Sequence, residues 1–136
     1  MTNKSLAQSY LLKATVRLRL LSVLMEEGAY SDVVREAQEI VELALKGILR
    51  QIGIEPPKIH DVGGLILEYS DRLPPSVRQK AARLAAISKW LRKEREFSFY
   101  GDIDFIPTEE YTKEDGERAQ RDAIFVVEAA KEAIPF

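Results

Sequence analysis

The 136-residue sequence contains no cysteine and only one histidine, His60. The absence of cysteine excludes a disulfide scaffold, a thiolate-bound zinc or iron–sulfur site and a cysteine nucleophile. A single histidine excludes a metal site built from several imidazoles of one chain, and leaves His60 as the one candidate for imidazole catalysis. The sequence also lacks metal-ligand spacing among its carboxylates and a glycine-rich phosphate loop that follows a strand. We therefore expect neither a metal nor another cofactor.

Long apolar runs are absent as well. No segment approaches the roughly 20 apolar residues of a membrane span, and the N-terminus lacks the apolar core and cleavage site of a signal peptide. We predict a cytoplasmic protein without membrane contact. Since the length is typical of one domain, residues 1–136 are expected to fold as a single domain.

The net charge of −2 conceals an uneven distribution. Residues 76–100 carry seven basic and two acidic side chains, a local charge of +5, whereas residues 101–136 carry four basic and ten acidic ones, a local charge of −6. A basic segment of this kind can serve a nucleic acid, a phosphate ligand or attraction to the acidic segment, or it can be an ordinary solvated helix face. The sequence leaves these interpretations open.

Helical periodicity dominates the chain, and no segment shows the alternation typical of a strand. The expected helices cover residues 4–27, residues 31–52 with Ser31 or Asp32 as N-cap, a short helix capped by Asp61, a fourth from about Val77 to the region 95–99, and a last helix that begins at the capping pair Thr112 and Asp115. Residues 101–112 are expected to form a loop. The short connections predict an all-α fold, an antiparallel, up-and-down bundle of four or five helices.

Gly47 lies inside the second predicted helix, where glycine costs about 1 kcal/mol relative to alanine. A close approach of another helix is the usual compensation. Three glutamates of the same helix follow its period and are expected to form an exposed flank; they are Glu36, Glu39 and Glu42.

Arg95 occupies a position where the fourth helix should face the core. The inward positions before it, separated by steps of three and four, are Val77, Ala81, Leu84, Ser88 and Leu91. A guanidinium group is always charged and needs a partner when it is buried. One interpretation places Arg95 at a helix end, with its head in solvent or paired with Asp102 or Asp104. The functional interpretation is an inward-facing anion or phosphate site, in which Tyr100 and Asp102 are further candidate ligands.

The aromatic residues that follow Arg95 also allow two interpretations. Phe97, Phe99 and Tyr100 can stack on a base beside the arginine, or they can close the end of the bundle core.

The order of these features resembles the HEPN domain, a helical bundle. The resemblance lies in residues 30–49, YSDVVREAQEIVELALKGIL, followed by Gly53 and by His60 before the third helix. Its second part is residues 95–102, followed by an acidic loop and the final helix. The similarity spans about residues 4–134, and its motifs are specific by their order rather than individually.

The resemblance implies a homodimer that works with a minimal nucleotidyltransferase as a toxin–antitoxin pair. Many members are metal-independent RNases with an arginine, four to six residues and then a histidine. Arg95 matches the arginine, but Tyr100, Gly101 and Asp102 occupy the three positions open to the histidine. An imidazole exchanges protons near neutral pH, whereas a tyrosine with a pKa of about 10 is a poor base. His60 corresponds to a capping or packing position of the family.

Three functions follow as alternatives. The leading prediction is a dimeric, non-catalytic or altered HEPN module that binds a nucleotidyltransferase, and a nucleotide or RNA through Arg95. The second is an RNase toxin in which Arg95 binds the scissile phosphate and Tyr100, aided by Asp102, handles protons. The third is a modification site, at which a partner transferase attaches a nucleotide to Tyr100.

Overall fold

The computed structural model describes residues 3–56, 58 and 61–136. Within these residues the chain forms helices and no strand, apart from one isolated bridge between Asp102 and Phe105. The helices are α1 (Asn3–Glu26), α2 (Tyr30–Gln51), α3 (Val62–Glu68), the 3-10 turn η1 (Ser70–Arg72), α4 (Pro75–Arg78), α5 (Ala81–Phe99), α6 (Pro107–Glu110) and α7 (Lys113–Ala133). The predicted all-α fold is confirmed.

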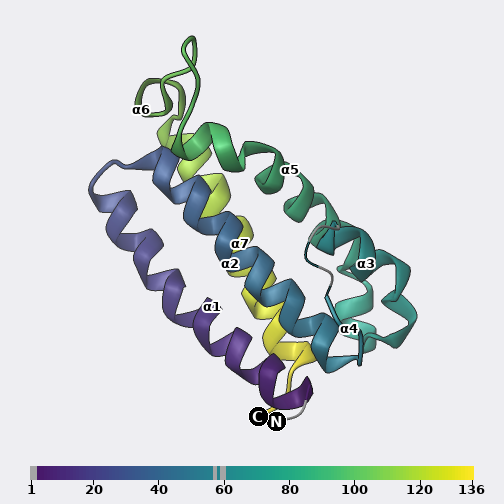
Figure 1. Cartoon of the computed structure of the whole chain (residues 1–136). Coiled ribbons are helices and arrows are strands. Elements are labelled where there is room, and N and C mark those ends of the chain that lie inside the picture. The colour runs from purple at the N-terminus through teal and green to yellow at the C-terminus, as the bar shows by residue number, and fades with distance from the viewer. Residues whose placement is uncertain (1–2, 57, 59–60) are drawn as a thin grey trace.

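Four long helices build the bundle. The chain runs up α1, down α2, up α5 and down α7, which is the predicted up-and-down arrangement (Figure 1). Both termini lie at the same end of the bundle, and the segment with α6 projects from the opposite end. Helix α2 occupies the centre, because it packs against α1, α5 and α7.

The core follows from the apolar face of α2. Val33, Ala37, Ile40, Ala44 and Ile48 are fully buried, as the spacing of three and four residues predicts. A Cβ atom at Gly47 would lie 3.3 Å from the Ala7 carbonyl oxygen and 3.4 Å from Tyr10 Cβ, so α1 does approach α2 closely there.

The helix ends agree with the predictions in two of three cases. The Asp61 side chain accepts a hydrogen bond from the Gly63 amide at 3.1 Å. Thr112 and Asp115 bond each other's backbone amides in a complete capping box. The predicted cap of α2 is wrong, because the helix already begins at Tyr30 and Ala29 occupies the N-cap position without a side-chain bond.

Two prolines explain where the predicted elements differ. Residues 101–112 are not entirely loop, since Pro107 begins the short helix α6. The predicted fourth helix is two helices, because Pro75 begins α4 and the chain then turns before α5. Proline suits the first turn of a helix, where its missing amide has no partner to lose.

The basic and acidic segments contact each other at few points. Lys80 Nζ lies 3.0 Å from Glu132 Oε1, and this ion pair joins the two segments. Attraction between the segments therefore accounts for little of the basic charge. In the part of the chain described, no helix has the combination of length and apolar character that crossing a membrane requires.

Candidate anion-binding site

Arg95 continues the inward stripe of α5, and the five positions before it are buried as predicted. At Arg95 itself the stripe reaches the surface, and 42% of the side chain is exposed. Its Nη2 atom lies 3.2 Å from Glu39 Oε1 of α2. The interpretation that pairs Arg95 with Asp102 or Asp104 is wrong, because its carboxylate partner comes from another helix.

Arg35 of α2 is a second arginine at this place. Its Nη1 donates a hydrogen bond to the Arg95 carbonyl oxygen at 3.3 Å, and Ser98 Oγ donates to the same oxygen at 3.1 Å. Carbonyl groups in the last turn of a helix lack partners within the helix, so these donors stabilise the end of α5. The backbone of α5 thereby holds the Arg35 guanidinium beside Arg95.

Glu39 is shared by both arginines. Its Oε1 atom lies 3.7 Å from Arg35 Nη2, four residues earlier on the same face of α2, and 3.2 Å from Arg95 Nη2. The predicted exposed flank is therefore wrong for Glu39, which bridges α2 and α5. Two cations and one carboxylate leave a local charge of +1. A phosphate group suits such a place, because each guanidinium offers it a planar fork of donors.

Phe99 and Tyr100 border this cluster of Arg35, Glu39 and Arg95, which we call the arginine cluster. The Arg35 guanidinium lies 5.0 Å from the centre of the Phe99 ring, a cation–π distance. Tyr100 packs edge-on against Phe99 at 4.9 Å, and 73% of Tyr100 is exposed. No hydrogen bond joins Tyr100 to Arg95 among the residues described. The structure thus brings Tyr100 to the edge of the cluster but not to the arginine.

Asp102 shapes the turn that follows. Its Oδ1 accepts a hydrogen bond from the Ile103 amide at 2.7 Å, and its backbone pairs with Phe105. Gly101 adopts a φ of +72°, and a Cβ atom there would collide with the Phe105 carbonyl oxygen. These contacts hold Asp102 in a tight turn beyond the arginine cluster. His60 lies outside the described residues, so its predicted packing role stays a prediction.

Tyr111 marks the other side of α5. Its hydroxyl donates to Glu94 Oε1 at 3.3 Å, and its ring packs edge-on against Phe105 at 5.8 Å. Burial, followed by the negative charge of Glu94, raises the pKa of Tyr111 above its ordinary value. Glu94 therefore faces a neutral phenol, whereas Glu39 faces two cations.

The arginine cluster is a surface site rather than a deep pocket. The cavity nearest to it along α2 and α5 has a volume of about 10 Å³ and is lined by Gln38, Val41, Glu42, Val62, Ser88, Leu91 and Arg92. This volume has room for a single water molecule and not for a nucleotide. Across the described ranges, no group of three or more acidic or histidine side chains is arranged to hold a metal ion.

Sequence reasoning found Arg95 but missed Arg35 and Glu39. The signal available was the spacing of four residues between them, with both on the face of α2 that carries the buried Gln38. That spacing identifies a shared face, but it does not show which helix the face meets.

The fold and this cluster define a helical-bundle protein in which two arginines and one carboxylate gather between two long helices. The chain belongs to the HEPN domain family, whose sequence model matches residues 7–133. A similar protein is named "Putative toxin MJ1304", from Methanocaldococcus jannaschii; it is 29% identical over 137 residues, which cover 96% of this chain and 89% of that protein. No solved structure matches the chain. The predicted resemblance is confirmed.

Proposed function

We propose that this HEPN protein is the helical, toxin-type component of a cytoplasmic toxin–antitoxin pair. In this proposal it is a homodimer, its partner is a minimal nucleotidyltransferase, and its arginine cluster binds the phosphate of a nucleotide or of RNA. The observation that supports phosphate binding is the convergence of Arg35 and Arg95 on the single carboxylate of Glu39. Similarity to a protein named as a toxin supports the class of system.

Phosphate binding follows from charge and access. The arginine cluster has one cation in excess, and both guanidinium groups are partly open to solvent. A phosphate can accept hydrogen bonds from the two forks while Phe99 and Tyr100 offer ring surface for an attached base. Single-stranded RNA presents both of these groups, so the site suits RNA as well as a free nucleotide.

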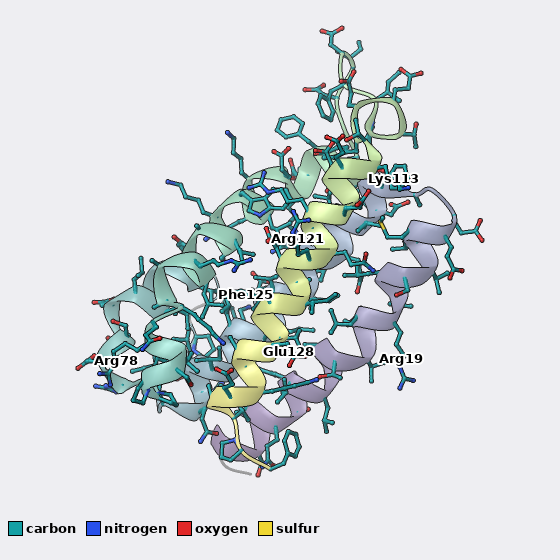
Figure 2. All side chains as sticks on the ribbon, turned by 180° about the vertical axis from the view of Figure 1, so that it is seen from behind. Arg19, Arg78, Lys113, Arg121, Phe125 and Glu128 are labelled. Carbon is teal, nitrogen blue, oxygen red and sulfur yellow. The ribbon has the colours of Figure 1, made fainter. Side chains whose placement is uncertain are left out.

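Binding of a fluorescein-labelled, single-stranded RNA and of ATP, followed by fluorescence anisotropy and calorimetry, tests this proposal. Arg95→Ala should weaken binding by about 10- to 100-fold, because hydrogen bonds to charged groups contribute about 1.5–3 kcal/mol. Arg121→Ala is the matched control, since Arg121 is an exposed arginine of α7 (Figure 2). Equal affinities of the wild type and Arg95→Ala would reject the phosphate site.

The partner is tested separately. A pull-down with the tagged protein from its native host should recover a small nucleotidyltransferase. A pull-down that recovers none would count against the toxin–antitoxin assignment while leaving the phosphate site intact.

A metal-independent RNase is the second candidate, favoured by the position of Glu39. In such a reaction the RNA 2′-oxygen attacks the adjacent phosphorus and the 5′-oxygen leaves. Arg35 and Arg95 would hold the phosphate, and the Glu39 carboxylate, rather than Tyr100, lies where it can accept the 2′-hydroxyl proton. Tyr100 remains the predicted donor for the leaving oxygen.

Cleavage of RNA in the presence of EDTA, from about pH 6 to pH 9, tests this candidate. Glu39→Gln and Arg95→Ala should abolish cleavage, whereas Tyr100→Phe should slow it. Intact RNA under all conditions would reject the RNase while leaving phosphate binding in place.

The exposure of Tyr100 also supports the third function, modification by the partner. The Tyr100 oxygen would attack the α-phosphorus of a nucleoside triphosphate, release pyrophosphate and lose its proton to the transferase. Intact-mass measurement after co-expression with the transferase should show one added nucleotide, absent in Tyr100→Phe. An unchanged mass would reject this role.

A further inference from the structure

Helix α1 has apolar residues on two opposite faces. Its inner face buries Ala7, Leu11, Ala14 and Leu21 against α2 and α7. Its outer face exposes Leu12, Val16, Leu20 and Val23, each between 45% and 61%. These four residues, which we call the outer stripe, are separated by steps of four, four and three and so lie on one side of the helix.

The outer stripe is continuous and uncovered. At 1.5 Å per residue it extends about 16 Å along α1. In Figure 1, α1 forms the edge of the bundle, and no other helix lies beyond it. Single exposed apolar residues are normal on a protein surface, but a continuous stripe of four large ones marks an interaction surface.

Charges beside the outer stripe identify its occupant. Lys13 and Arg19 are exposed in the first part of the helix, and Glu26 and Glu27 are exposed at its end. Figure 2 shows Arg19 pointing from α1 away from the bundle. Within the described chain these four side chains form no ion pair. A nucleic acid or an anionic lipid surface would be repelled by the glutamates, so a partner with both signs of charge fits better.

The arrangement is self-complementary. Lys13 and Glu27 each lie seven residues, or two helical turns, from Leu20, on opposite sides of it. A two-fold axis at Leu20 would therefore place Lys13 against the partner's Glu27 twice, with the two Leu20 side chains in contact at the centre. The same axis brings Val16 against the partner's Val23. Parallel pairing would instead place like charges together.

We propose that the outer stripe of α1 is a homodimer interface in which the α1 helices of two copies pair antiparallel across Leu20. This inference deepens the proposed dimeric module by naming its surface, and it is independent of the phosphate site. The stripe lies on α1, whereas the arginine cluster joins α2 and α5. Each copy would keep its own cluster.

The first experiment is analytical ultracentrifugation of the full chain across a wide concentration range. The wild type should dimerise, and Val16→Glu should raise the dimer Kd at least about tenfold, because it places an unpaired carboxylate in the interface. Leu67→Glu is the matched control, since Leu67 of α3 is 47% exposed and should leave the Kd unchanged. Circular dichroism melting verifies that both variants fold. A monomeric wild type, or a dimer that Val16→Glu leaves intact, would overturn the inference.

Charge exchange provides a second, sharper test. Lys13→Glu and Glu27→Lys should each weaken the homodimer, because each brings like charges together. An equimolar mixture of the two variants should form a heterodimer more readily than either homodimer, since both contacts are then between opposite charges. Absence of heterodimer in native mass spectrometry contradicts the proposed register. Loss of RNA binding in Arg95→Ala is a separate measurement, so failure of one proposal does not conceal the outcome of the other.

Discussion

Two arginines of this bundle lie over phenylalanine rings, and their surroundings differ. Arg83 in the first half of α5 lies 3.7 Å from the centre of the Phe125 ring, and it forms no ion pair within the described chain. Arg35 lies 5.0 Å from the Phe99 ring, but it also bonds the end of α5 and shares Glu39 with Arg95. The ring contact is common to both regions. The second cation is what makes the arginine cluster a candidate site.

Packing separates the two regions further. Around the first half of α5, α3 approaches so closely that a Cβ atom at Gly63 would lie 2.9 Å from Ser88 Cβ and 3.0 Å from Ala85 Cα. At the end of α5, Phe97, Phe99 and Tyr100 are all exposed. The same helix therefore supplies a rigid support in its first half and accessible groups at its end. The predictions below change one region at a time.

The largest effect is expected for Gly63→Ala in the packed region. The added methyl group meets the backbone of α5, so we expect a loss of about 1–3 kcal/mol in the free energy of unfolding. Gly64→Ala is the matched control, because its Cβ meets only the movable Asp61 side chain and alanine favours the helix. Thermal melting measures both. A wild-type melting temperature for Gly63→Ala would contradict the close packing of α3 on α5.

The two ring-bound arginines should respond in opposite ways. Arg83→Ala should lower the free energy of unfolding by about 0.5–1 kcal/mol, the worth of an exposed cation–π contact, without affecting RNA binding. Arg35→Ala should weaken RNA binding about tenfold or more, because it removes half of the paired donors. Anisotropy and thermal melting of both variants measure this contrast. Equal RNA affinities of the two variants would remove the distinction between the regions.

The sequence allowed the packed region to be predicted more fully than the site. The steps from Val77 to Leu91 identify the buried face of α5, because helix geometry relates residues a few positions apart. The contact of Arg35 with Arg95 spans 60 positions and depends on how two helices dock, which periodicity within one helix does not determine. The spacing from Arg95 to Tyr100 is similarly limited, since α5 ends at Phe99 and leaves Tyr100 exposed at its C-cap.

A smaller effect is expected for Glu39→Gln in the arginine cluster. Glu39 occupies both guanidinium groups, so a phosphate must compete with it. Removing its charge while keeping its shape should raise RNA affinity several-fold, most strongly at low salt, where electrostatic contributions are largest. Anisotropy titrations at two salt concentrations measure the change, with Glu36→Gln on the same helix as the control. A loss of affinity would show that Glu39 positions the arginines rather than competing with the ligand.

The smallest effect near neutral pH, with a distinct pH dependence, is expected for Tyr111→Phe. The folded state raises the pKa of Tyr111, because burial and Glu94 disfavour the phenolate. The resulting stabilisation is complete below the unfolded pKa of about 10 and is lost as the pH rises above it. The free energy of unfolding of the wild type should therefore fall more steeply above about pH 10 than that of Tyr111→Phe, and urea unfolding measures both. Parallel curves would show that Glu94 and Tyr111 are not coupled, and that the carboxylates on the two sides of α5 have similar surroundings.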